Sequence, residues 1–203
     1  MKYSYLSDSS DLLSTLEDFS SVSVPDNEVT NTVSGIIEEI RLRGDAALLE
    51  KTLLYDGASL AANEISVLPA ELTEAESRLS NSERSAILEA ISNIRLFHEK
   101  SIPNNWCTRN KHGAEVGEKH YPIKRVGIYI PGGNVPLVST VIMTVTLAKV
   151  AQVPEITVVT PPDSSGKVSY HLLAALEMLG VTEVYRVGGC LLYTSPSPRD
   201  VEE

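Results

Sequence analysis

The chain has 203 residues, of which 42% are apolar and 22% charged, and its formal net charge is −10. These values are ordinary for a globular protein and exclude a collagen-like or wholly disordered chain. The acidic balance argues against a nucleic-acid-binding domain, which normally carries a basic face. The uncharged stretch Val126–Ala148 is interrupted by prolines and glycines, so it predicts a strand, a turn and a helix rather than a membrane span.

Cysteines and histidines give no sign of a metal site or of secretion. Cys107 and Cys190 could form at most one disulfide and show no CxxC spacing. The four histidines, which match no zinc motif, are His98, His112, His120 and His171. The N-terminal residues MKYSYLSDSSDLL lack the apolar segment of a secretory signal. The sequence therefore predicts a cytoplasmic protein with no metal ligands and no membrane or nucleic-acid partner.

Residues 1–104 are expected to be helical. Asp26 is a predicted N-cap, and the apolar residues after it fall on one face of a helix: Val29, Val33, Ile36, Ile37 and Ile40. Gly44 is predicted to end that helix, and a second helix follows from Asp45 to the Asp56-Gly57 pair.

Further helices are expected after a short apolar run. Residues 65–68 indicate a short strand before Pro69, and Thr73 and Glu76 have the spacing of a capping box. A long helix is predicted from Ser82. Its apolar stripe contains Ile87, Ile91, Ile94 and either Phe97 or His98.

Residues 105–125 lose the helical period and are rich in Lys and Arg, and they predict a β-hairpin or linker. Strands are then expected at 126–130, 156–160 and 183–187, with helices at about 135–150 and 168–179 between them. This β-α-β-α-β order is typical of a parallel sheet covered by helices, so the predicted fold class is α/β.

The turn Pro131-Gly-Gly-Asn134 between the first of these strands and its helix is the best candidate for a binding site. Glycines allow a ligand to approach the backbone, and a helix N-terminus attracts an anion such as a pyrophosphate. The spacing is not that of the GxGxxG dinucleotide fingerprint, however, and a tight turn without a ligand is an equal alternative. Tyr129 precedes this turn, where its ring could stack on a nucleotide or pack in the core.

The run RVGIYIPGGNVPLVSTVIMTVTLAKVAQVPEITVVTPP resembles the signature region of histidinol dehydrogenases. The likeness continues in HLLAALEMLGVTEVYRVGG and upstream in RLRGDAALLEKTLLYDG and IRLFHEK, so it covers about residues 24–189. The resemblance implies an incomplete Rossmann-like, NAD-binding unit at 126–189, with Tyr129 as a cofactor contact. It also implies an enzyme that oxidises L-histidinol to L-histidine with NAD and zinc (Zn), usually as a homodimer.

The same resemblance implies that catalytic groups are missing from this chain. The family's acid/base pair and zinc ligands lie further downstream, and a glutamine expected after Gly188-Gly189 is replaced by Cys190-Leu-Leu. No catalytic residue is therefore assigned, and we expect an N-terminal portion that is inactive alone. A non-catalytic nucleotide-binding module and a fragment without a stable fold are the alternatives.

Residues 190–203 are expected to be foreign to the family. Pro196 and Pro198 are incompatible with the helix that should follow the third strand. The string CLLYTSPSPRD also resembles translated adapter sequence.

Overall fold

The computed structural model describes residues 27–132 and 136–189. The predicted N-cap Asp26 and the predicted foreign tail at 190–203 lie outside these residues. The first two described helices are α2 (Asn27–Arg43) and α3 (Asp45–Asp56). Gly44 and Gly57 stand at their ends with φ angles of +56° and +69°, a backbone conformation that glycine adopts without strain. The predicted helix ends are confirmed.

A short 3₁₀ helix, η1 (Ala62–Glu64), leads to α4 (Pro69–Ser77). Two predictions for this region are wrong. Residues 65–68 form no strand but a single antiparallel bridge from Ser66 to Tyr185, because a strand pairing ends where Pro69 starts α4. Thr73 lies inside α4, with its hydroxyl donating to the Pro69 carbonyl, and so caps nothing.

The long helix α5 (Asn81–Ser101) carries a capping box at its start. The Glu83 amide donates to Ser80 Oγ (3.3 Å), and the Ser80 amide donates to Glu83 Oε2 (2.8 Å). Ile87 and Ile91 are buried as predicted, whereas Phe97 faces solvent. The apolar stripe thus packs on the core only along the first part of the helix.

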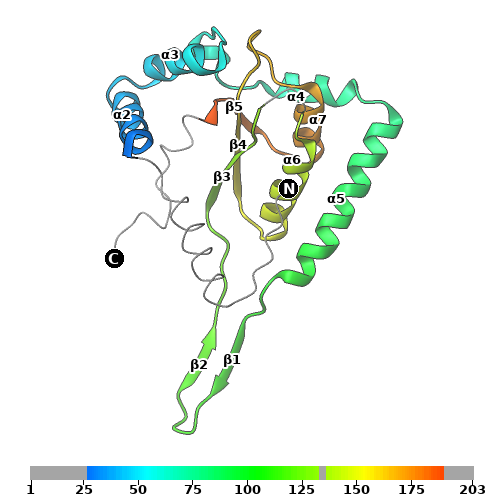
Figure 1. Cartoon of the computed structure of the whole chain (residues 1–203). Coiled ribbons are helices and arrows are strands. Elements are labelled where there is room, and N and C mark those ends of the chain that lie inside the picture. The colour runs from blue at the N-terminus through cyan, green and yellow to red at the C-terminus, as the bar shows by residue number, and fades with distance from the viewer. Residues whose placement is uncertain (1–26, 133–135, 190–203) are drawn as a thin grey trace, which may run out of the picture.

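Strands β1 (Trp106–Arg109) and β2 (Glu115–Glu118) form the predicted antiparallel hairpin, which projects away from the rest of the molecule (Figure 1). All eight strand residues are exposed. The turn closes through Asn110, whose side-chain oxygen accepts the amides of His112 and Ala114.

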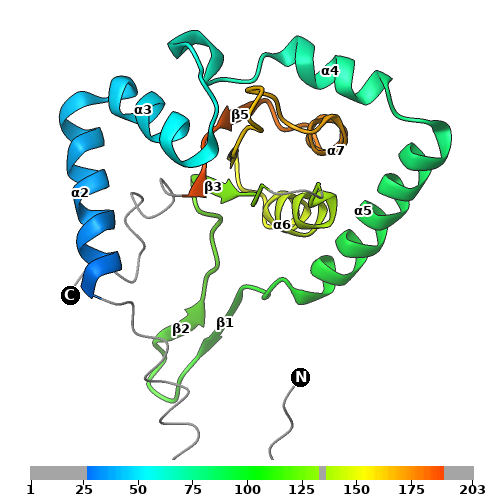
Figure 2. The ribbon, with the colours of Figure 1, turned by 45° about the horizontal axis from the view of Figure 1, so that its top comes forward.

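The predicted parallel sheet is present in the order β3-β4-β5. Its strands are β3 (Arg125–Tyr129), β4 (Glu155–Thr160) and β5 (Glu183–Arg186). They are connected by α6 (Val138–Val150) and α7 (Tyr170–Met178), which lie on one side of the sheet, while α2 and α3 lie on the other (Figures 1 and 2). Helix α6 begins later than predicted, because Leu137 has a non-helical backbone (φ −85°, ψ 61°). The α/β fold class is confirmed.

One row of side chains connects the sheet to its helices. Ile128, Val158 and Val184 are register neighbours on the three strands, and all three are buried. They belong to one core with apolar residues of α4, α5, α6 and α7.

At the amino ends of the strands, the Arg125 guanidinium donates hydrogen bonds to side chains of β4 and β5, and its acceptors include the Glu155 carboxylate (3.0 Å). None of the described helices is long and apolar enough to cross a membrane.

Candidate functional site

A cleft of about 520 Å³ lies at the carboxyl ends of β3 and β4, beside the start of α7. Parallel sheets place ligands at this edge, and the volume is within the range of small-molecule sites, roughly 300–1,000 Å³. Its lining residues come from four parts of the chain: Asp56, Tyr129, Pro131, Gly132, Pro136, Thr160, Pro161, Pro162, Asp163, Lys167, Val168, Ser169 and Leu172. The arrangement brings helix α3 to the end of the sheet.

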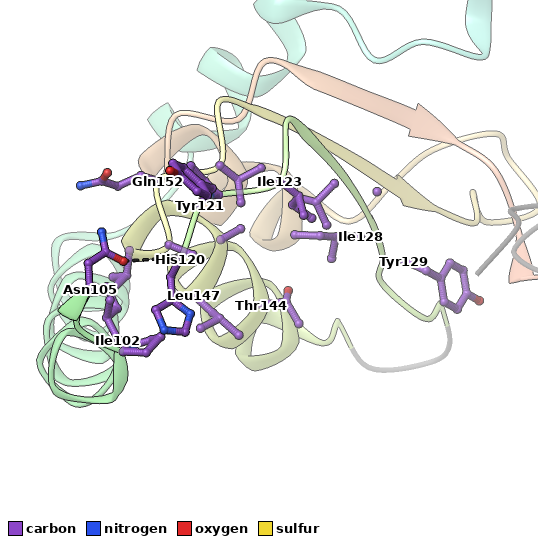
Figure 3. Close-up of a pocket in the computed structure, with 18 residues that line it drawn as sticks. Ile102, Asn105, His120, Tyr121, Ile123, Ile128, Tyr129, Thr144, Leu147 and Gln152 are labelled. Carbon is purple, nitrogen blue, oxygen red and sulfur yellow. Dashed lines mark hydrogen bonds between the residues drawn. The ribbon is translucent and has the colours of Figure 1, made fainter. Parts of the chain in front are cut away.

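Tyr129, the residue predicted from sequence to contact a cofactor, lines this cleft as the last residue of β3. Its side chain is half-buried, and its ring lies at the far end of the strand, apart from the other labelled residues in Figure 3. A Cβ atom built on Gly189 would lie 2.7 Å from the Tyr129 hydroxyl, so the Gly-Gly pair after β5 leaves room for this ring. Its role as a cofactor contact stays a prediction.

The predicted glycine turn is described only in part. A side chain on Gly132 would collide with the ring of Pro161, so glycine here permits close approach of the segments that follow β3 and β4. Gly133 and Asn134 lie outside the described residues. The expected anion site at the start of the following helix therefore stays a prediction.

Asp163 and Lys167 form the exposed rim of the cleft. Asp163 Oδ1 accepts the Ser165 hydroxyl (2.6 Å) and the amides of Ser165 and Lys167. These hydrogen bonds, that of the Ser165 hydroxyl first, hold the pKa of Asp163 below its usual value, so the carboxylate is ionised and occupied with shaping its own loop. Lys167 contributes a positive charge beside the start of α7, whose dipole also favours an anion.

Asp56 is a cleft residue that sequence reasoning treats only as the end of a helix. Its Oδ2 atom is buried and has no hydrogen-bond partner in the described part of the chain. Burial raises the pKa of Asp56. The signal that could have found it is its position: a carboxylate at a helix C-terminus opposes the helix dipole and is unfavourable without another reason.

Arg186, the last residue of β5, holds the end of this strand in place through its side-chain contacts. This residue is 6% exposed, and its guanidinium donates to the carbonyl oxygens of Glu64 (2.8 Å) and Ser66 (3.0 Å) and pairs with the Glu71 carboxylate. The residues before α4 are thereby tied to the strand that leads into Gly188 and Gly189. The Gly-Gly backbone beside Asp56 and Tyr129 is consequently held in place.

A second, larger hollow of about 870 Å³ runs along β3 and α6 (Figure 3). Its labelled lining is mainly apolar, with Ile102, Ile123, Ile128 and Leu147 facing into it. The hydrogen bond from the His120 amide to Asn105 Oδ1 (2.7 Å) closes one end. We call this hollow the apolar groove.

In residues 27–132 and 136–189, no three His, Cys, Asp or Glu side chains are grouped to hold a metal ion.

Comparison with known proteins identifies the family. Residues 21–191 match the family model described as histidinol dehydrogenase. The chain belongs to the histidinol dehydrogenase family. It is 43% identical over 162 residues to a histidinol dehydrogenase of Symbiobacterium thermophilum, an alignment that covers 80% of this chain and 37% of the relative. With one of Bacillus licheniformis it is 38% identical over 169 residues, covering 83% and 39%.

A solved structure supports the same assignment. The crystal structure of histidinol dehydrogenase from Elizabethkingia anophelis aligns with a TM-score of 0.77 and 34% sequence identity. The alignment covers 83% of this chain and 39% of that chain. This chain therefore spans about two fifths of the length of these histidinol dehydrogenases.

Proposed function

We propose that this chain is the NAD-binding, N-terminal part of an enzyme that oxidises L-histidinol through L-histidinal to L-histidine. Family membership supports the reaction. The observation that carries the cofactor assignment is the polar cleft at the carboxyl ends of the parallel strands, with Tyr129 in its lining. NAD, when bound, supplies the hydride acceptor for this oxidation.

The cleft has groups suited to the different parts of a dinucleotide. The half-buried ring of Tyr129 offers a surface on which a flat ring can stack. Lys167 and the start of α7 favour a phosphate. We assign Tyr129 to direct contact with NAD and leave the acid/base residues to the part of the enzyme that this chain does not include.

Zinc does not fit the described residues, since they contain no suitable group of three ligands. We therefore propose that the zinc ion implied by the family resemblance is bound by residues beyond this chain, and no step is assigned to it here. The 203-residue chain should show no histidinol-dependent NADH formation and no stoichiometric zinc in metal analysis.

The proposal includes a homodimer in the cytoplasm, as the resemblance implies. The described cysteine, Cys107, is exposed and free, which suits a reducing compartment. Sedimentation of the complete gene product at twice the mass of one chain would support the dimer, and a monomer would contradict it.

The decisive experiment extends the source gene beyond codon 189 and purifies its complete product. With L-histidinol, NAD and Zn²⁺, that product should form NADH, recorded by absorbance. A folded, zinc-loaded product that leaves L-histidinol unchanged would refute the proposed reaction.

A second candidate function is a nucleotide-binding module without catalysis. It is favoured by one observation: the described lining residues of the cleft come from α3, from the ends of β3 and β4 and the segments after them, and from the start of α7, which pack together in one folded unit. A source gene that encodes residues 190–203 uninterrupted and then stops would favour this module over the enzyme.

A further inference from the structure

Asp56 is placed at the cleft by backbone packing rather than by an ionic partner. It ends α3, one turn after Thr52, whose buried side chain donates back to the Leu48 carbonyl. The carboxylate lies against Gly188, where any Cβ would collide with it. The glycine after β5 thus leaves the space that this carboxylate occupies.

In the described part of the chain, no hydrogen bond or ion pair stabilises the Asp56 carboxylate against its partial burial. Oδ2 is buried against Gly188 without a partner, while the residue as a whole is half-buried and lines the cleft. Helix α3 also directs the negative end of its dipole to the same place. Asp163, the other acid of the cleft, differs in this respect, because its Oδ1 accepts three hydrogen bonds from its own loop. Asp163 therefore has a structural role that Asp56 lacks.

A carboxylate accepts hydrogen bonds and donates none when ionised, so the missing partner is a donor. A dinucleotide carries donors on its sugars, on the adenine amine and on the nicotinamide carboxamide, and of these the two adjacent sugar hydroxyls can together bond both oxygens of one carboxylate. In dinucleotide-binding folds an acid commonly takes this role, and it disfavours a phosphate on the same sugar. That acid normally follows the second strand of the sheet, whereas Asp56 comes from a helix outside the sheet.

We propose that Asp56 accepts hydrogen bonds from the diol of the adenosine ribose of NAD, the ribose that carries the additional phosphate in NADP, and so sets the preference of the cleft for NAD over NADP. The inference rests on the proposed function of this cleft. It adds a specificity-determining residue that reaches the sheet from α3. The nicotinamide ribose carries the same diol in NAD and in NADP, so a contact with it would give no such preference.

The test measures ligand binding to the 203-residue chain by ligand-observed NMR, a method that detects weak affinities. Asp56→Asn should weaken NAD binding about tenfold or more, as expected for the loss of a charged hydrogen-bond partner. It should also reduce the ratio of NAD to NADP affinity. Asp45→Asn makes the same charge change at the opposite end of α3, away from the cleft, and should leave both affinities unchanged.

The two riboses are distinguished with mononucleotides. Asp56→Asn should weaken binding of AMP and not of nicotinamide mononucleotide. The reverse pattern would place Asp56 at the ribose that NAD and NADP share and would overturn its role in specificity. Unchanged NAD affinity and an unchanged NAD/NADP ratio would overturn the assignment of Asp56. A folded parent chain that binds no NAD would instead refute NAD binding by this unit, and the inference with it.

Circular dichroism melts separate a binding role from a structural one. Asp56→Asn and Asp56→Ala should both retain a cooperative melt, because the carboxylate holds no described partner in place. If both variants lose that melt, Asp56 is a structural residue and the proposal is overturned.

Discussion

The two hollows of this molecule lie on the same strand and differ in what lines them. The apolar groove is the larger, at about 870 Å³ against 520 Å³ for the cleft at the strand ends. In the groove, Ile123 and Leu147 are 60% and 47% exposed, and β3 pairs with β4 alone among the described strands. The cleft instead gathers Asp56 from α3 with Asp163 and Lys167 from the segment after β4, and Tyr129 lines both hollows.

This difference shows that volume alone does not identify a binding site. Uncovered aliphatic side chains along an edge strand are what a packing surface leaves when nothing lies on it. Convergent polar groups with one unpartnered carboxylate have no packing explanation and indicate a ligand. The contrast can be tested with matched residues: a glycine in each hollow, and Tyr121, which lines the groove and not the cleft, against Tyr129, which lines both.

The largest effect is expected from the glycines. Gly132→Ala should lower the free energy of unfolding by about 1–3 kcal/mol, because the new methyl group collides with Pro161 in the cleft wall. Gly127→Ala adds the same methyl group at the groove, where nothing lies within 4 Å, and should change stability by less than about 0.5 kcal/mol. Urea denaturation measures both. Equal effects would contradict the close packing of the cleft.

Replacing Tyr129 or Tyr121 should show whether NAD affinity depends on the cleft or on the apolar groove. Tyr129→Ala should weaken NAD binding about tenfold, since a stacked ring contributes about 1–1.5 kcal/mol to such a contact. Tyr121→Ala removes an exposed ring of the groove and should leave NAD binding unchanged. Calorimetry on both variants is the measurement. If Tyr121→Ala were the more harmful, the groove would be the nucleotide site.

A charge in the groove should improve solution behaviour without affecting the cleft. We expect the exposed aliphatic side chains of the groove to cause self-association of the chain. Leu147→Lys places an ammonium group among them and should reduce this self-association in light scattering. The cleft and its NAD affinity should remain as in the parent chain. Unaltered self-association would show that copies of the chain do not associate through the apolar groove.

The smallest effect concerns the pH dependence of stability. The folded-state pKa of Asp56 is raised by burial, so the native state holds this proton more tightly than the unfolded chain does. Ionisation of Asp56 therefore costs stability above its folded pKa, and this cost disappears as the pH falls below the unfolded value. The other titratable groups of the cleft are Tyr129, Asp163 and Lys167. They are the same in the parent chain and in a variant of Asp56, so the difference in Tm between the two at each pH reports on Asp56.

Asp56→Asn should accordingly raise the Tm by about 1–3 °C at neutral pH, with the gain shrinking as the pH is lowered. Asp163→Asn should do the opposite, because hydrogen bonds lower the pKa of that carboxyl and its ionised form stabilises the fold above the unfolded pKa. Thermal melts between acidic and neutral pH test both signs. A gain for Asp56→Asn that grows on acidification would contradict the unpaired state of its carboxylate.

Much of the fold follows from local pattern. The ends of α2 and α3 are predictable from Gly44 and Gly57, since only the glycine conformation continues the chain there at low cost. The β-α-β-α-β order at 126–189 is predictable from alternating apolar runs and turns. Sequence reasoning is wrong where another segment decides the structure: the bridge at Ser66 depends on β5, and the earlier helix start at Pro69 places Thr73 inside α4.

The sequence by itself determined most of the helices, the hairpin and the parallel sheet, because each is encoded by neighbours within a turn or a strand. Tyr129 became a cofactor candidate through the family resemblance of its segment. The domain boundaries proposed from it stay predictions. Only the tertiary structure set Asp56 against Gly188 and both beside Tyr129, since the packing of α3 on the far side of the sheet brings them together. No local spacing encodes that contact, because an unpaired carboxylate is recognised only when its surroundings are known.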